Sequence, residues 1–108
     1  MVIENYNPLS IDWSKIPSEK ISGEKGFTLS KTQSVGNIRI RLVEYSDNYI
    51  ADHWCEKGHI IHILKGELII EYKNSTHITK SGMTHIVGDS TNVHKARSFT
   101  GATVLIID

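Results

Sequence analysis

The dominant signal along the chain is an alternation of apolar and polar residues with a period of two. This pattern is typical of β-strands, because successive side chains of a strand point to opposite faces. It is clearest over residues 37–45, in which two isoleucines and a leucine occupy one face and two arginines the other. The predicted strands are 27–35, 37–45, 60–64, 67–73, 76–80, 83–87 and 102–107.

Short polar or glycine-containing segments separate these strands and predict turns or loops. Residues 10–17 allow only a short helical turn, and no stripe with the 3.6-residue period of a long helix occurs. Strands that recur about every 8 to 12 residues with turns between them predict an all-β sandwich or barrel. The predicted turns lie at 36–37, 46–48, 65–66, 74–75 and 81–82, and a longer loop covers 88–92.

Two predicted strands, 60–64 and 102–107, are apolar on both faces. When one face of a sheet packs on the core, an apolar second face needs a cover of its own. For so short a chain we expect that cover to be a second copy, so we predict a homodimer. The residues predicted to point away from the core are Ile60, Leu64, Val104 and Ile106.

Length, charge and cysteine content narrow the class of protein. A chain of 108 residues is long enough for one domain with a modest core. Its twelve basic and twelve acidic residues cancel, so charge gives no reason to expect nucleic acid or an anionic membrane as partner. No apolar run approaches the roughly 18 to 20 residues of a membrane helix, and the first residues lack a signal-peptide pattern. A single cysteine cannot form an internal disulfide, so we expect a reducing, cytoplasmic environment.

The candidate chemistry is concentrated in residues 52–66. His53, His59 and Cys55, the only cysteine, lie within seven residues of one another, and an apolar run and a glycine follow at once. In an extended chain His53 and Cys55 point the same way. Imidazole and thiolate are ordinary ligands of borderline divalent metals, so the cluster predicts a metal site.

The spacing of this cluster resembles the first motif of cupins, which are small β-barrel proteins. That motif has His-x-His, then a Glu, and a glycine seven residues after the Glu. Gly66 corresponds to the glycine, and counting back seven places leads to His59 where the family usually has Glu. Cys55 stands in place of the second histidine, and His53 matches the first.

A second cupin motif begins with a glycine, here Gly82, and contributes one more histidine. Gly88 stands where the family usually has proline, and His94 matches the motif histidine one place late. The whole chain is similar to a narrower group, the DHCW-motif cupin-fold proteins. The segments that carry this resemblance are 11–14, 38–45, 52–55 and 57–59.

The resemblance implies an all-β jelly-roll barrel, the double-stranded β-helix of cupins, and a homodimer. Residues 37–108 correspond to the barrel. Residues 1–36 form an N-terminal segment with an edge strand, expected to pack on the barrel or on the dimer partner. A metal-type pocket is implied in the mouth of the barrel, but the DHCW group implies no particular activity.

We predict that a divalent metal (iron, zinc, nickel or manganese) is held by His53, His59 and His94. Cys55 is either a fourth ligand, as a thiolate, or a small buried side chain that only packs. Asp52 and Glu56 are candidates to orient ligand histidines, although solvated carboxylates are the simpler interpretation.

Two functions fit such a site. The first is a non-catalytic module that binds a small, anionic ligand. The alternative is a metal-dependent enzyme, either a dioxygenase whose ligands resemble those of cysteine dioxygenase, or an isomerase or lyase. The missing motif Glu removes a recognisable general base and favours the binding module.

The remaining histidines and the two strand arginines have weaker assignments. His62 has the opposite parity to His59 and is predicted on the outer face or at a dimer contact. His77 and His85 are predicted to be surface or strand residues, with His85 the nearer to the pocket. Arg39 and Arg41 either line one face for an anionic substrate or are solvated or dimer-facing, and we favour the second interpretation.

Overall fold

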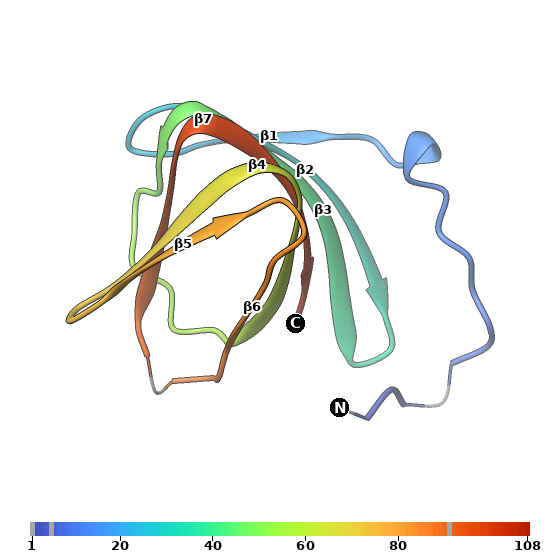
Figure 1. Ribbon diagram of the computed structural model, residues 1–108. Helices are drawn as coiled ribbons and strands as arrows, with labels where there is room; N and C mark the ends of the chain where they lie inside the picture. The colour runs from blue at the N-terminus through green and yellow to red at the C-terminus, as the bar shows by residue number, and fades with distance from the viewer. Residues whose placement is uncertain (1, 5, 91) are drawn as a thin grey trace.

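The structure is a computed structural model, and it describes residues 2–4, 6–90 and 92–108. Figure 1 shows a chain built almost entirely of strands, with one short helical turn before them. The elements are η1 (Trp13–Lys15), β1 (Glu19–Ser22), β2 (Phe27–Val35), β3 (Ile38–Ile50), β4 (His59–Tyr72), β5 (Thr76–Lys80), β6 (Thr84–Val87) and β7 (His94–Ile107).

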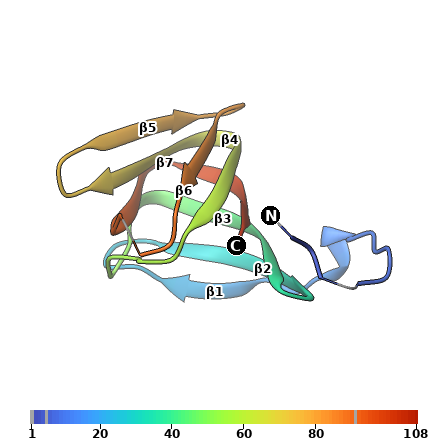
Figure 2. The same cartoon turned by 90° about the horizontal axis from the view of Figure 1, so that it is seen from below.

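All seven strands belong to one antiparallel sheet with the order β1-β2-β3-β7-β4-β5, and β6 pairs with the first part of β4. Figures 1 and 2 show this sheet curling around a single interior. β5 pairs with residues 67–71 of β4 and β6 with residues 59–62. The sheet order contains no pairing between β5 and β6, so the described sheet is curled but not closed.

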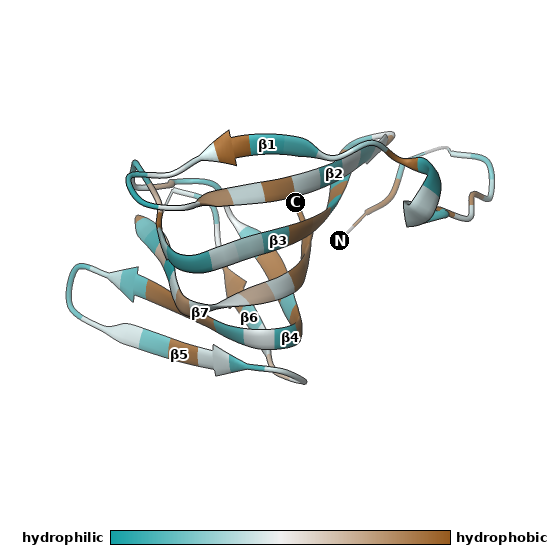
Figure 3. Cartoon of the chain, turned by 90° about the horizontal axis from the view of Figure 1, so that it is seen from above, coloured by the Kyte–Doolittle hydropathy of each residue, from teal (hydrophilic) through white to brown (hydrophobic). Residues whose placement is uncertain are grey.

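The core lies on the inner, concave face of the sheet. Ile63, Leu68, Ile70 and Val104 are almost completely buried there. They come from the two long central strands, β4 and β7, which cross the middle of the sheet. Figure 3 shows apolar and polar residues alternating along strands such as β2 and β3, as expected for a sheet with two different faces. The other buried members of this core are Val43, Ile61, Ala102 and Ile106.

Two predicted interruptions are absent, because the strands run through them. The expected turn at 65–66 lies inside β4, where the pairing with β7 shifts register around Gly66. Gly66 has φ +79°, and a Cβ there would meet the backbone of Gly101. It therefore forms a bulge rather than a hairpin. The expected loop at 46–48 belongs to β3, which continues to Ile50.

The assignment of residues to faces is confirmed for some strands and wrong for others. Ile60 and Leu64 point outward as predicted, since the buried Ile61 and Ile63 alternate with them. Val104 and Ile106 were also predicted to point outward, but they are 0% and 4% exposed. Val104 pairs with both Val43 and Ile63, and cross-strand partners share a face, so all three lie in the core.

The arginines of β3 lie on the same face as the core. Arg39 and Arg41 share the parity of the buried Val43, so they extend from the inner face. The favoured prediction, that they are solvated or dimer-facing, is therefore wrong for Arg41, whose side chain is 22% exposed, whereas the side chain of Arg39 is 41% exposed. The predicted separation of the two sets of side chains on β3 is confirmed, since Ile38, Ile40 and Leu42 lie on the opposite, outer face.

Before the curled sheet, the chain runs as an extended segment with few contacts to the body. Asn37 accepts a hydrogen bond from the backbone of Glu4 and donates one to the carbonyl of Val2. Lys31 donates to the carbonyl of Trp13. β2 was predicted to be an edge strand, but the short β1 pairs with it and takes the edge. In the described part of the chain, the only helix spans three residues, and none could cross a membrane.

Candidate metal centre

Cys55 and His94 are brought together by the backbone. The amide of Cys55 donates to the carbonyl of His94 at 2.7 Å, and the amide of His94 donates to the carbonyl of Cys55 at 3.0 Å. This isolated antiparallel bridge lies where β7 begins. Because residues paired in this way present their side chains to the same face, the thiol and the imidazole become neighbours.

His59 is the first residue of β4 and is oriented by a carboxylate far away in the sequence. Its Nδ1 lies 2.8 Å from Oδ2 of Asp108. The Asp108 side chain is only 1% exposed, and it is held further by Arg39 at 2.9 and 3.0 Å and by Arg41 at 3.0 Å. An ionised carboxylate can only accept hydrogen bonds, so Nδ1 of His59 carries the proton and Nε2 keeps a free lone pair.

The same arrangement holds the second imidazole. Nδ1 of His94 lies 3.0 Å from the carbonyl oxygen of Asn92, which also can only accept. The proton of His94 is therefore on Nδ1, and its Nε2 is buried without a hydrogen-bond partner among the described residues. A buried, unpaired nitrogen costs free energy unless something binds it, so Nε2 is placed to bind a ligand.

The ligand atoms of Cys55, His59 and His94 lie within 4.8 Å of one another. Sγ of Cys55 is 3.6 Å from Nε2 of His59. Bond lengths of about 2.3 Å to sulfur and about 2.0 Å to nitrogen at a tetrahedral angle give about 3.5 Å between such atoms. The rings of His59 and His94 lie 5.1 Å apart and almost perpendicular, at 89°. The three side chains could therefore hold one metal ion without large movements.

Electrostatics keep His59 in the protonation state that a metal ligand needs. Burial lowers the pKa of His59, and this effect exceeds the opposing influence of Asp108, so the imidazole is neutral at pH 7. Burial alone would raise the pKa of Asp108, but the hydrogen bonds from Arg39 and His59 and the charge of Arg41 lower it to about 2. Asp108 is therefore ionised throughout the physiological range.

The three side chains line a cavity of about 340 Å³ on the inner face of the sheet. Its wall includes the apolar side chains of Ile61, Ile70 and Ile106. Four basic side chains also line it, and no carboxylate does so among the described residues. The cavity is thus partly apolar and electropositive. The basic residues are Arg39, Arg41, Lys57 and Lys95.

Comparison with known proteins identifies the architecture. No family model matches the sequence, and no curated protein is similar enough to match it. Solved structures do match. One is an RmlC-like cupin from Shewanella frigidimarina, with a TM-score of 0.75 and 12% identity, covering 94% of this chain and 90% of that one. The chain has the cupin fold.

Two further solved structures match over most of the chain. A protein from Thermotoga maritima described as a predicted oxalate decarboxylase matches with a TM-score of 0.74 and 16% identity, over 92% of this chain and 96% of that one. The EutQ protein of Clostridium difficile matches with a TM-score of 0.74 and 11% identity, over 91% and 83%. Because the sequence identities are this low, these matches establish the fold alone. They confirm the predicted cupin-type jelly roll, which in this chain is a curled sheet that does not close.

The structure brings three of the four predicted ligands of this cupin-fold protein together and leaves one apart. Cys55, His59 and His94 form the cluster. His53 lines the same cavity, but its side chain is 75% exposed and its Nδ1 lies 2.6 Å from a carboxylate oxygen of Asp52. Asp52 thus contacts His53 and not the clustered imidazoles.

Sequence reasoning missed the residue that orients His59. Asp108 lies 49 positions away along the chain, and its side chain belongs to no recognisable motif. The only available signal was the arginine pair of β3, whose inward orientation needs an internal anion nearby. That signal was outweighed by the ordinary expectation that strand arginines are solvated.

The other histidines lie outside the cluster. His62 is on the outer face, as predicted, and its Nδ1 lies 2.8 Å from the hydroxyl of Thr84. His77 is exposed on β5, and His85 is buried on β6. Both line a separate cleft rather than the cavity of Cys55, His59 and His94. Trp54, between His53 and Cys55, is 48% exposed.

Proposed function

We propose that this cupin-fold protein binds one divalent metal through Cys55, His59 and His94 and holds a small anionic ligand at the remaining coordination position. Three protein ligands with an open position are the usual arrangement of metal sites that bind exchangeable molecules. The metal would supply positive charge at the inner end of the cavity. The chain's own residues would select and orient what binds there.

The main support for this proposal is that both imidazoles carry their proton on Nδ1 and leave Nε2 unprotonated. His59 and His94 each donate from Nδ1 to an oxygen that can only accept, at 2.8 and 3.0 Å. Both Nε2 atoms are therefore free to bind a metal, and the Cys55 sulfur lies 3.6 Å from one of them. Hydrogen bonds of this kind fix the orientation of metal-binding histidines in proteins generally.

The donor set favours some metals over others. One thiolate and two imidazoles suit zinc, iron or nickel, whereas manganese prefers oxygen ligands. A thiolate ligand also needs a reduced cysteine, which supports a reducing compartment such as the cytoplasm. His53 remains a candidate fourth ligand, but its ring would first have to leave Asp52.

The nature of the ligand follows from charge. A divalent metal with one thiolate has a formal charge of +1, and Arg41 and Lys57 add positive charge to the cavity wall. A cavity of about 340 Å³ is at the lower end of the range for small-molecule sites. These properties support a small carboxylate or another compact anion as the ligand. The apolar side of the cavity supports a ligand with a short hydrocarbon part.

The cavity supports binding more directly than catalysis. Asp108 is ionised, and its oxygens are engaged by Arg39, Arg41 and His59, so it is poorly placed to accept a proton from a substrate. No other carboxylate lines the cavity among the described residues. We therefore retain the binding module as the proposed function. Membership of the DHCW group remains part of this proposal, supported by the segments that resemble it.

Metal analysis of untagged, full-length protein tests the proposal. We expect about one zinc, iron or nickel ion per chain, and we expect His94→Ala to lose most of it. His62→Ala is the matched control, since this histidine contacts Thr84 on the outer face of the sheet. Full metal retention in His94→Ala, or equal loss in His62→Ala, would contradict the proposed ligand set.

We also propose that a second copy of the chain covers the outer face of the sheet. On this face Leu105 pairs with Leu42 and His62, and Ile107 pairs with Ile40 and Ile60. These apolar side chains are only partly buried within one chain. Covering apolar surface contributes roughly 25 cal/mol per Å², and the zero net charge gives two copies little reason to repel each other.

A further inference from the structure

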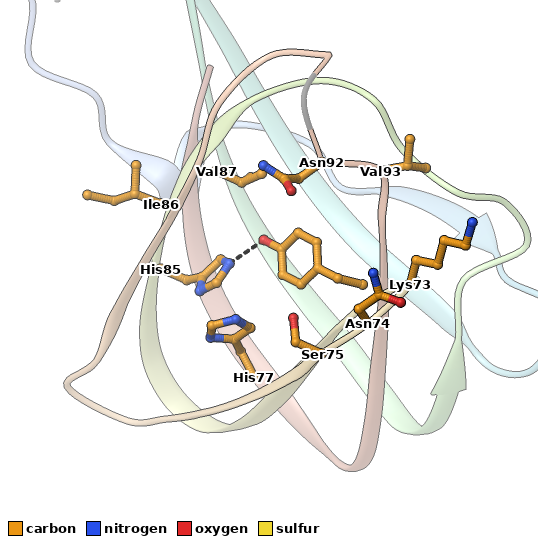
Figure 4. Close-up of a pocket in the computed structure, with 10 residues that line it drawn as sticks. Lys73, Asn74, Ser75, His77, His85, Ile86, Val87, Asn92 and Val93 are labelled. Carbon is orange, nitrogen blue, oxygen red and sulfur yellow. Dashed lines mark hydrogen bonds between the residues drawn. The ribbon is translucent and has the colours of Figure 1, made fainter.

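A second cleft lies beside the proposed metal centre, and the ring centroid of Tyr72, which lines this cleft, is 5.9 Å from that of His94. The cleft has a volume of about 560 Å³ and is lined by β4, β5 and β6 and by the turn after β4. Figure 4 shows the rings of His77 and His85 side by side in this cleft, and the ring centroid of Tyr72 lies 5.4 Å from that of His77 and 5.8 Å from that of His85. Each comes from a different strand: Tyr72 ends β4, His77 lies on β5, and His85 lies on β6.

All three rings extend from the inner face. His77 pairs with the buried Ile70, and His85 pairs with the buried Ile61, so each shares its partner's face. The cleft therefore opens where the sheet lacks a pairing between β5 and β6. Neither histidine is used by the proposed metal centre.

Tyr72 and His85 form a short hydrogen bond. The phenol oxygen of Tyr72 lies 2.6 Å from Nε2 of His85, which is only 9% exposed. This bond fixes the plane of the His85 ring. When Nε2–H of His85 donates to the phenol oxygen, the proton is held on Nε2 and Nδ1 keeps its lone pair for a metal.

The two histidines have the separation of a metal-binding pair. The ring centroids of His77 and His85 are 4.9 Å apart, with planes at 61°, and Figure 4 shows ring nitrogens of the two residues facing each other. Two imidazoles on one metal, with bonds of about 2.0 Å at a tetrahedral angle, have centroids about 5 Å apart. The corresponding distance between His59 and His94 is 5.1 Å.

We propose that His77 and His85 form a second site for a divalent metal, of the zinc or copper type, with Tyr72 as the residue that orients His85. Two imidazoles are suitable donors for these metals. Asn74 and Ser75, whose side chains carry oxygen atoms, line the same cleft. The bound metal links β5 to β6, which are not joined by backbone pairing in the sheet order. It thereby closes the open side of the sheet and stabilises the fold.

Zinc titration of four full-length proteins tests this proposal: wild type, His94→Ala, His77→Ala and the double variant. We expect two zinc ions per wild-type chain, one in each single variant and none in the double variant. Because His77 is exposed, its replacement by alanine leaves the fold intact, which circular dichroism verifies. His62→Ala is the matched control, since His62 contacts Thr84 on the outer face.

Two further measurements separate a built site from incidental binding. Saturating zinc should raise the melting temperature of His94→Ala but leave that of the double variant unchanged, since a ligand stabilises only the state that binds it. Tyr72→Phe keeps the ring but loses the hydrogen bond, and it should weaken zinc binding in the His94→Ala background by about tenfold. One zinc ion per wild-type chain, or equal loss in His62→Ala and His77→Ala, would overturn the proposal.

Discussion

Nδ1 of His59 lies 2.8 Å from a carboxylate oxygen of Asp108, which joins the first residue of β4 to the end of the chain. Asp108 is 1% exposed and is neutralised by Arg39 and Arg41. Its negative charge keeps the proton of His59 on Nδ1. The unprotonated Nε2 lies 3.6 Å from Sγ of Cys55. One buried carboxylate thus organises both the basic wall of the cavity and a candidate metal ligand.

Asp108→Asn tests this relationship. The amide can present its NH₂ group to His59, which allows the other imidazole tautomer and removes the charge that holds the ring. We expect metal affinity to fall by about 10- to 100-fold, the usual effect of losing such a partner. Competition with a chromogenic chelator measures this. Asp52→Asn removes the carboxylate beside the exposed His53 and should leave affinity unchanged.

The pH dependence of stability provides a second test. The pKa of Asp108 is lowered from 3.8 to about 2 in the folded protein, so the ionised group stabilises the fold at any pH above about 4. That contribution is lost as the pH falls through about 2. In metal-free protein, the excess free energy of unfolding of wild type over Asp108→Asn should therefore shrink from pH 4 to pH 2. Urea unfolding at several pH values measures it, and a constant difference would contradict the assigned ion pairs.

Replacing the thiolate should change anion binding. Cys55→Ser removes one negative charge from the metal site, which raises its formal charge from +1 to +2. We expect acetate to bind more tightly to the cobalt-loaded variant than to the cobalt-loaded wild type, as followed by the visible spectrum. Arg41→Met removes positive charge from the cavity wall and should have the opposite effect. Equal acetate affinity in all three proteins would show that Cys55 does not ligate and that the anion binds elsewhere.

The proposed dimer predicts a different phenotype for two neighbouring residues of β7. Leu105→Lys introduces charge on the outer face and should convert a dimer to a folded monomer, measured by light scattering at micromolar concentration. Ile106→Lys should unfold the chain instead, because Ile106 is 4% exposed in the core. Ile78→Lys is the control, since Ile78 is 55% exposed on β5 and pairs with Ile69 rather than with the residues around Leu105 and Ile107. A monomeric wild type would contradict the dimer.

The strands and the candidate ligands follow from local information. Alternation over residues 27–35 and 76–80 determined β2 and β5 to the residue, because a sheet with one buried face repeats its pattern every two positions. The spacing of His53, Cys55 and His59 likewise indicated a metal site, since those residue types combine in metal centres. These two results depend only on residue type and short separations along the chain, whereas His94 was added by the resemblance to the second cupin motif.

Other features depended on which strands pair. The inward orientation of Val104 follows from its pairing with Val43 and Ile63, which no local pattern reveals because residues 102–107 are apolar at both parities. Strand β4 likewise continues through Gly66 because its pairing with β7 shifts register there. Pairing between distant strands is a property of the whole sheet, so a turn-like dipeptide there was misleading.

Local alternation predicted an all-β sandwich or barrel, and residue types at short spacing predicted a metal site around His53, Cys55 and His59. The open curl of the sheet and the side chains that complete the cavity depend on contacts between distant residues. Asp108 reaches His59 across 49 residues, and the backbone bridge between Cys55 and His94 spans 39 positions. The partners of a buried charge are chosen by the fold, since the free energy of burying it depends on every group that surrounds it.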